Sequence, residues 1–432
     1  QRKVLEGIAF AKRQQDLHLC PKARSAAERL RAWLARLPGV ARAEIAGSLR
    51  RRKETVKDID LLVATRAPAA VMAAFRRVPG VASVIASGDT KTSLRTEAGI
   101  QVDLRAVSEA EFPAALLYFT GSRAHGIALR SLAKGKGLLL NEYGLFRGRR
   151  RLPAASEADL YKALGMAAIP PELREDLGEI RAAIKGKLPI LVEEKDLQGV
   201  FHVHTTESDG ADSLEDMVLA AQKRGYAFVG ISDHSRSAGY AHGLDAARVR
   251  AQHKAIDTLQ KRVRIRILKG IESDILPDGS LDYDARTLAA FDFVIASVHS
   301  AFDQPEKAMT ARICKALSNP RTTMLGHATG RLLLSRPPYA VDMEKVIDHA
   351  AEAGTAIEIN ANPQRLDLDW RLCRRAVEKG VRLAINPDAH QAGAYDHTAY
   401  GVGIARKGWV EKKDLLNAMP VKNLEKALAA RA

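Results

Sequence analysis

Seven short apolar segments, each followed by an amphipathic helical pattern, constrain the second half of this 432-residue chain more than any other feature. Such alternation is typical of parallel strands that are joined by crossover helices. Seven units of this size predict a β/α barrel, closed or distorted. The segments span residues 199–203, 227–232, 264–271, 291–297, 322–326, 355–360 and 381–386.

Potential metal ligands recur where these predicted strands end. In a β/α barrel the carboxyl ends of the strands form the face that carries active sites, so we expect the ligands to meet. Histidines and carboxylates without cysteine suit Zn²⁺, Mn²⁺ or Fe²⁺ better than Mg²⁺. Up to three ions could be held, with Glu272 bridging. The nine residues are His202, His204, Asp209, His234, Glu272, His299, His327, Asp388 and His390.

A single His-x-His pair would more often be an ordinary core or surface pair. Its repetition at one predicted strand end after another favours a metal site whose activated water attacks a phosphoester. Arg331 and Arg336, which follow His327, are candidates for holding the substrate phosphate.

A separate group of carboxylates lies in the first half of the chain, within the segment GSLRRRKETVKDIDLLV at residues 47–63. Asp58 and Asp60 are two apart on a predicted strand, so their side chains share one face. Neighbouring carboxylates repel one another unless a cation lies between them, and Mg²⁺ prefers oxygen ligands. If the predicted strand at 100–107 lies alongside, Asp103 completes a site for two Mg²⁺ or Mn²⁺ ions.

Phosphate-binding groups precede these carboxylates. Gly47 and Ser48 form a small-residue turn whose N–H groups and hydroxyl can bind a phosphate. Arg51, in the basic run 50–53, can hold a triphosphate. Each piece alone is commonly just a polar strand or a solvated loop. Together, at this spacing, they indicate the nucleotidyltransferase superfamily.

Charge divides the chain unequally. Residues 1–190 hold 34 Lys and Arg against 19 Asp and Glu, a net charge of +15, which leaves +1 of the total +16 for the rest. This asymmetry favours a polyanion partner for the first half. Residues 1–37 and 108–185 show helical patterns, and strands are expected between 42 and 107, for example at 81–86. The Gly-, Pro- and charge-containing stretch after residue 185 predicts a linker.

The segment LYFTGSRAHGIALRSLAKGKGLLLNEYGLF, residues 117–146, resembles the nucleotide-binding motif of family X DNA polymerases. That resemblance implies that Asp58, Asp60 and Asp103 bind the catalytic metals. Ser48 and Arg51 would contact the triphosphate. Tyr118 and Phe119 would pack against the incoming sugar, Gly121 would lie under the nucleotide, and Arg130 would reach the template minor groove. The chain departs from the family at Arg123 and Gly126, where an acidic residue and an asparagine are usual.

The second half resembles the polymerase and histidinol phosphatase (PHP) domain, with every ligand position filled, which implies 3′–5′ exonuclease and related phosphoesterase activity. The whole resembles a bacterial family X polymerase of α/β and α+β domains. The implied division is partial fingers helices at 1–37, a palm at 38–107, a helical thumb at 108–185, a linker at 186–198 and a distorted barrel at 199–432. Because LEGIAF lies at residues 5–10, close to the start of the chain, we expect the family's small N-terminal DNA-binding domain to be lacking.

We therefore expect a repair polymerase that adds dNTPs to a primer 3′ end and carries an attached 3′–5′ exonuclease, with DNA (primer-template, gaps or 3′ ends) as its partner. No apolar stretch is long enough for a membrane span, and Cys20, Cys314 and Cys373 form no C-x-x-C pair, so a cytoplasmic monomer is expected. Two alternatives remain. One is a small-molecule phosphatase with a spent polymerase half, and the other is a DNA-end binder with structural metals. Intact carboxylates argue against the first, and clustered metals with open positions argue against the second.

Overall fold

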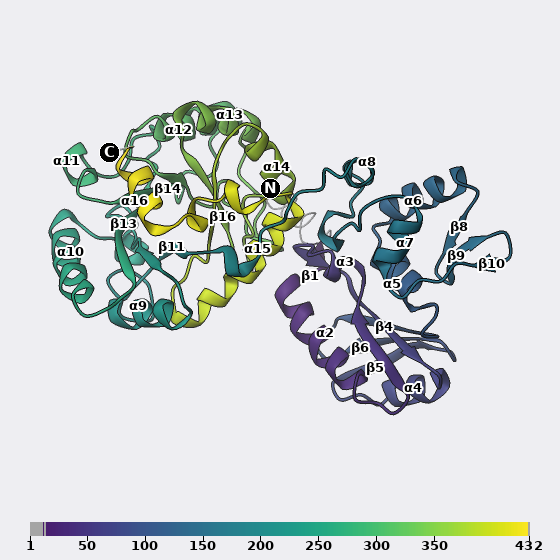
Figure 1. The fold of residues 1–432 in the computed structure, drawn as a ribbon. Helices are drawn as coiled ribbons and strands as arrows, with labels where there is room; N and C mark the ends of the chain where they lie inside the picture. The colour runs from purple at the N-terminus through teal and green to yellow at the C-terminus, as the bar shows by residue number, and fades with distance from the viewer. Residues whose placement is uncertain (1–11, 13, 431–432) are drawn as a thin grey trace. The chain divides into compact units, whose positions relative to one another are not determined.

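The computed structural model describes residue 12 and residues 14–430, and the chain forms two compact units, residues 1–189 and 190–432 (Figure 1). Of the predicted helical stretch 1–37, residues 1–11 and 13 lie outside the described residues. The rest of that stretch contains helix α2, Cys20–Leu34. The boundary between the units falls within the stretch predicted as a linker.

A five-stranded sheet with the order β2-β4-β7-β6-β5 forms the centre of the first unit. Its neighbouring strands β4 and β7 are parallel, and the other pairs are antiparallel. Buried and half-exposed residues alternate along β7, as expected for a strand with one buried face. The strands predicted at 58–63, 81–86 and 100–107 are confirmed. The sheet strands are β2 Val40–Ile45, β4 Asp58–Thr65, β5 Val81–Ser87, β6 Lys91–Thr96 and β7 Gln101–Val107.

Helices α2 and α4 supply the apolar side chains, such as Ala27, Leu34 and Phe75, that complete the core of this sheet. The same unit contains a two-stranded ladder, in which β1 pairs with β3. The one-turn helix α3 lies between β2 and β3 in the sequence. These elements are β1 His18–Leu19, α3 Gly47–Arg50, β3 Thr55–Val56 and α4 Pro68–Phe75.

Residues 108–185 are helical as predicted, but a small antiparallel sheet that was not predicted interrupts the helices. Gly148, with a φ angle of 59°, turns the chain between β9 and β10. A glycine in this conformation favours a hairpin over a continuous helix. The elements are α5 Phe112–Thr120, α6 Arg123–Gly135, β8 Leu139–Asn141, β9 Gly144–Arg147, β10 Arg150–Arg151, α7 Glu157–Ala163, η1 Pro171–Leu173 and α8 Glu179–Ile184.

The second unit is the predicted seven-stranded parallel barrel, with the strands in sequence order. All seven predicted strands are present. Beyond its last strand, Ala389 exchanges backbone hydrogen bonds with His202 of the first strand and with His204 just after it, which draws the two edges together. The barrel is therefore nearly closed. Its strands are β11 Gly199–Val203, β12 Phe228–Ile231, β13 Arg266–Asp274, β14 Phe293–Ser297, β15 Met324–Leu325, β16 Ala356–Asn360 and β17 Leu383–Asn386.

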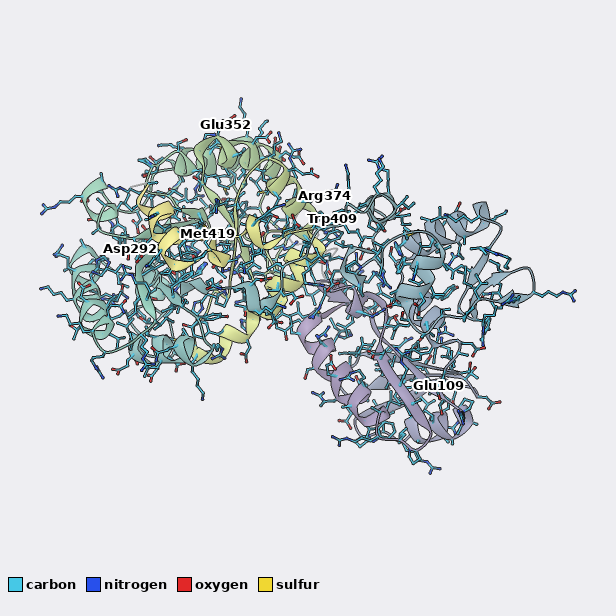
Figure 2. The ribbon with its side chains drawn as sticks, in the orientation of Figure 1. Glu109, Asp292, Glu352, Arg374, Trp409 and Met419 are labelled. Carbon is cyan, nitrogen blue, oxygen red and sulfur yellow. The ribbon has the colours of Figure 1, made fainter. Side chains whose placement is uncertain are left out.

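Helices surround these strands (Figure 1). Side-chain caps begin several of them: Ser213, Asp245 and Asp342 each accept a hydrogen bond from an otherwise unpaired N–H group in the first turn. Arg374 lies 4.2 Å from the ring centroid of Trp409 on the outer surface (Figure 2). The helices are α9 Leu214–Lys223, α10 Ala246–Gln260, α11 Ala285–Leu288, α12 Glu306–Leu317, α13 Met343–Ala353, α14 Trp370–Glu378, α15 Thr398–Lys407 and α16 Val421–Ala429.

Short 3₁₀ turns complete the second unit: η2 Glu194–Asp196, η3 Gly239–Ala241, η4 Ala392–His397, η5 Lys412–Asp414 and η6 Leu416–Ala418. Among the helices of the described residues, none combines the length and the apolar character that a membrane crossing requires.

Candidate metal centres

The nine predicted ligands of the second unit converge at the carboxyl ends of the barrel strands, with Glu272 of β13 in the middle. Oε1 of Glu272 lies 3.2 Å from Nε2 of His202, 3.3 Å from Nε2 of His299 and 2.9 Å from Nε2 of His327. Its Oε2 lies 3.0 Å from Nδ1 of His234. Nε2 of His204 lies 3.7 Å from the same oxygen. One carboxylate thus faces five histidines, which suits a residue that would bridge ions.

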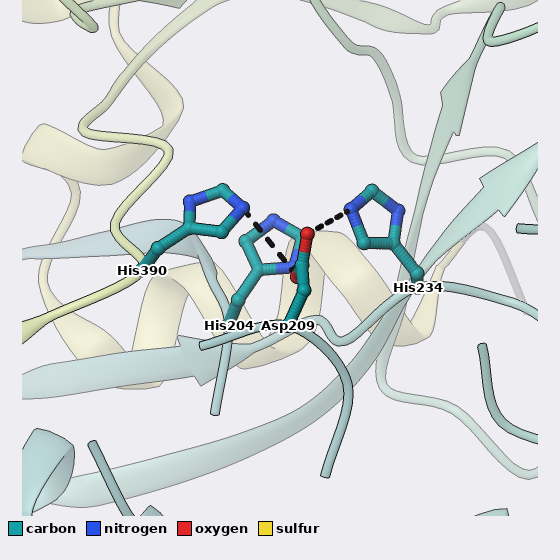
Figure 3. A group of neighbouring side chains, drawn as sticks. All are labelled: His204, Asp209, His234 and His390. Carbon is teal, nitrogen blue, oxygen red and sulfur yellow. Dashed lines mark ion pairs between the residues drawn. The ribbon is translucent and has the colours of Figure 1, made fainter. Parts of the chain in front are cut away.

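Asp209 organises the other end of this group (Figure 3). Its Oδ2 lies 3.6 Å from Nε2 of His234, and its Oδ1 lies 3.5 Å from Nε2 of His390. Nδ1 of His204, whose ring lies between those two histidines, is 3.6 Å from Oδ1. Asp388 joins the two ends because its Oδ1 lies 3.5 Å from His202 and 3.4 Å from His204.

The donor atoms fit divalent metals. They fall into four overlapping groups, each with atoms within 4.8 Å of one another, and all nine residues take part. Ring nitrogens of His202, His204, His234 and His327 are buried and form no hydrogen bond among the described residues. Such burial is costly unless a partner binds, and separations of about 3 Å suit ligands that share one ion.

Protonation differs along the group. Burial, with His390 and His234 beside it, lowers the pKa of His204 to about 3, so this ring is neutral as a metal ligand must be. For His234, Glu272 and Asp209 overcome the opposing effect of burial and raise the pKa to about 10. Burial opposes ionisation of Glu272 too, but His202 and His299 hold its pKa well below the ordinary range. Without metals the group therefore shares protons between histidines and carboxylates.

A second layer of carboxylates orients the histidines. Nδ1 of His202 lies 2.6 Å from Oε1 of Glu358, and Nδ1 of His299 lies 2.6 Å from Oδ1 of Asp274. Glu358 also accepts a hydrogen bond from the backbone N–H of His327. Such bonds turn the opposite ring nitrogen toward the site. Sequence reasoning missed both carboxylates, although Glu358 stands alone in an apolar strand, which is a usable signal.

The backbone is strained where it presents ligands. His202, His327 and Asp388 have φ angles of 56°, 22° and 51°, a region that residues with side chains rarely adopt. Strain of this kind persists where the surrounding structure imposes it, and it clusters at functional sites.

Three arginines follow the ligand strands. All three guanidinium nitrogens of Arg331 bond to Asp369 or to the carbonyls of residues 365 and 366, and Arg336 bonds to the carbonyl of Gly330. Their suggested phosphate contacts stay predictions. Arg365, which the sequence did not single out, has Nε 3.4 Å from Asp388 and a buried Nη1 without a hydrogen bond among the described residues.

In the first unit, the parallel pairing of β4 with β7 sets Asp60 opposite Asp103 and Asp58 opposite Gln101. The condition placed on Asp103, that its strand lie beside the first, is met. Burial, followed by the charges of Asp58 and Asp103, raises the pKa of Asp60 to about 7. Burial and Asp103 also raise the pKa of Asp58. Burial opposes ionisation of Asp103 too, but hydrogen bonds from Gln101, Lys91 and Ser93 lower its pKa. Asp58 and Asp60, whose ionisation is disfavoured beside the charged Asp103, are with it a platform for cations.

Gly47 lies directly against this platform. Its φ angle is 62°, and a Cβ atom placed on it would lie 2.0 Å from Oδ2 of Asp60. Ser48 follows in the same short helix, α3. Arg51 has Nε 3.0 Å from Glu175 and donates to the carbonyl of Thr120. Arg51, which was predicted to contact the triphosphate, is therefore bonded to other residues of the chain in this structure.

The aromatic motif lies at the end of α5. Tyr118 is exposed and stands edge-on to Phe119, with ring centroids 5.1 Å apart. Arg130 of α6 faces the Tyr118 ring at 5.6 Å. Tyr118, Gly126 and Arg130 line a small notch. Gly121, at φ 69°, lies against Arg51, with 3.1 Å between an added Cβ and Nη1. Among the predicted nucleotide and template residues, Tyr118 therefore lies against Arg130, and Gly121 lies against Arg51.

Comparison with known proteins fits these observations. The family model described as DNA polymerase beta thumb matches residues 115–175, and the model described as PHP domain matches residues 201–362. Together with the barrel and the sheet, these matches define a DNA polymerase that carries a PHP phosphoesterase domain. The chain is 41% identical to the DNA polymerase/3'-5' exonuclease PolX of Bacillus subtilis, over 98% of this chain and 75% of that protein. It therefore belongs to the PolX family, and it is an enzyme.

Other similar proteins match less than half of this chain. A probable phosphatase of Thermoanaerobacter sp. is 30% identical over 44% of this chain and 77% of its own length. A crystal structure of Leishmania infantum polymerase beta covers 37% of this chain and 77% of that chain, at 23% identity and a TM-score of 0.31.

Proposed function

We propose that the two activities of this PolX family member occupy the two sites described above. Asp58, Asp60 and Asp103 bind Mg²⁺ or Mn²⁺ and add a dNTP to the 3′ end of a DNA primer. The nine-residue group binds up to three Zn²⁺ or Mn²⁺ ions and hydrolyses phosphoesters at 3′ ends. The observation that carries the proposal is the convergence of all nine donors, with buried ring nitrogens that form no hydrogen bond among the described residues.

In the carboxylate site, bound ions supply charge to stabilise the attacking and leaving oxygens. The chain's own part is positioning. Gly47 leaves room for Asp60, and Lys91, with Nζ 3.1 Å from Oδ2, holds Asp103 in place. Arg51 would exchange Glu175 for a phosphate of the incoming nucleotide. Tyr118 and Phe119 would take the sugar, and Arg130 the template strand.

In the nine-residue site, bound ions lower the pKa of a coordinated water and thereby supply the nucleophile. Glu358 and Asp274 hold His202 and His299 in the tautomers that face the ions. Arg365, beside Asp388, is a cation suited to the substrate phosphate.

DNA is the partner that the charge of the first unit favours. The β9–β10 hairpin carries Arg147, Arg149, Arg150 and Arg151, all exposed, and none forms an ion pair with a described acidic residue. Four free arginines on a short hairpin suit a phosphate backbone. A cytoplasmic monomer is the form of the enzyme that this proposal assumes.

Paired variants test the assignment. Asp58→Ala with Asp60→Ala should abolish primer extension and leave 3′-end degradation within about twofold, because the metals of the two sites are held by separate units. His202→Ala with His204→Ala should do the reverse. Primer extension that survives the first pair would remove the polymerase assignment. Degradation that survives both the histidine pair and chelation would remove the nuclease assignment.

A further inference from the structure

An exposed aromatic side chain stands at the edge of the nine-residue group. Tyr240 lies in the turn η3, and its ring centroid is 6.0 Å from that of His234 and 6.4 Å from that of His299. The residue is 69% exposed, and no other Tyr, Phe or Trp among the described residues of the second unit is exposed. Figure 3 shows His234 on one side of the group, and Tyr240 lies at that side, next to His234.

Tyr240 contributes little to packing or hydrogen bonding. The hydroxyls of Tyr339 and Tyr395 donate to the carbonyls of Ala328 and Met217, and both rings are buried. No hydrogen bond among the described residues involves the hydroxyl of Tyr240. Its ring therefore has neither of the structural roles that the other tyrosines have.

The loop that carries Tyr240 is nevertheless held firmly. Ser237 donates to the buried carboxylate of Asp282 from its N–H at 2.7 Å and from its hydroxyl at 2.5 Å. Leu244 pairs with Ser235 and donates to the carbonyl of His234. Gly243 packs so tightly that an added Cβ would lie 1.9 Å from the carbonyl oxygen of Ser235. An exposed ring on a fixed loop loses little conformational freedom when a ligand binds.

We propose that Tyr240 forms a nucleobase subsite at the mouth of the metal centre, where it stacks on the base of the 3′-terminal nucleotide; this rests on the nuclease assignment above. A nucleotide carries its base one sugar away from its phosphate. When the scissile phosphate lies at the ligands, the base falls beside the group, where the free ring stands. Aromatic rings stack on every base, so the subsite selects a nucleotide end without selecting a sequence.

Two oligonucleotides that differ only at the 3′ end test this in the full-length chain with Mn²⁺. One ends in an ordinary nucleotide and the other in an abasic deoxyribose. Tyr240→Ala should raise KM for the base-bearing end about tenfold or more, the usual weight of one stacked base, with kcat within about threefold. Both constants for the abasic end should stay within about twofold. Tyr240→Phe, which keeps the ring, should restore the original KM.

Leu219→Ala, which alters another exposed apolar side chain of the same unit, is the matched control and should change neither substrate. Equal losses on both ends, or no loss on either, would overturn the subsite. Failure of the unaltered chain to degrade either end would overturn the nuclease assignment instead.

Discussion

At Gly47, the lack of a side chain leaves the space that the Asp60 carboxylate fills. Gly47→Ala should reduce the kcat of nucleotide addition by about a hundredfold, because a Cβ 2.0 Å from Oδ2 displaces the carboxylate by the order of an ångström. Degradation of 3′ ends should be unchanged. Primer extension and degradation, measured on one preparation, check this.

Gly80→Ala is the control for backbone strain. Gly80 also has a positive φ angle, 86°, but an added Cβ meets nothing within 4 Å. That variant should lose about 1 kcal/mol of stability and keep its activity. If both glycine variants lose nucleotide addition equally, strain rather than the displaced carboxylate is the cause.

The raised pKa of Asp60 has a consequence for stability without metals. A protonated Asp60 stabilises the folded chain, and that contribution is lost as the pH rises from the ordinary carboxyl pKa of about 4 to the raised value of about 7. Asp60→Asn removes this loss. In chelator, the variant should have a free energy of unfolding about 1–3 kcal/mol higher at pH 8 and a smaller gain at pH 5.

Urea unfolding at the two pH values, followed by a probe of the first unit, measures that gain. An equal gain at pH 5 and pH 8 would show that the amide packs better and that the charge of Asp60 is not involved. Added Mg²⁺ should stabilise the unaltered chain more than the variant, since the ion replaces the lost proton.

Among the elements, the β9–β10 hairpin carries the clearest prediction for DNA binding. Arg149→Gln with Arg150→Gln should weaken binding to a primer-template. It should also reduce the slope of log affinity against log salt by up to about 2, since each lost phosphate contact contributes about 0.9. Arg76→Gln with Arg77→Gln, another exposed adjacent pair, should leave the slope unchanged. Equal changes in the two pairs would mean that net charge, and not the hairpin, attracts DNA.

The barrel elements could be predicted from the sequence almost completely. Apolar runs such as those of β12 and β16 are buried on both faces, so they stand out from the polar loops that flank them. The nine ligands follow from the same regularity, because strand ends in a parallel barrel meet on one face. The hairpin of residues 144–151 could not be predicted in this way, since its strands are too short for a period to show.

Contacts between side chains of different strands could not be predicted from the sequence. That Glu358 bonds to His202 and Asp274 to His299 depends on the distances between side chains from different strands. The register that sets Asp60 opposite Asp103 depends likewise on strand pairing, so the sequence could state it only as a condition. The left-handed backbone at His202 and Asp388 has no local signal, because tertiary structure imposes it.

For the whole molecule, the uneven distribution of metal ligands predicts an uneven response to metal removal. The second unit holds nine candidate ligands, four of them histidines with buried nitrogens that form no hydrogen bond among the described residues, so the metal-free form leaves these polar atoms poorly satisfied. Mn²⁺ at a hundredfold excess over its dissociation constant should stabilise this unit by about 2.7 kcal/mol for each site that only the folded state forms. Calorimetry with and without chelator should show the shift.

His202→Ala with His204→Ala separates specific binding from a general salt effect. The metal-dependent shift should disappear in that variant, while Asp58→Ala with Asp60→Ala should keep it, because the carboxylates belong to the other unit. A shift that survives the histidine pair would mean that the ions stabilise the chain elsewhere. Loss of the shift in the carboxylate pair would mean that the carboxylate site, and not the nine-residue group, supplies the metal-dependent stabilisation.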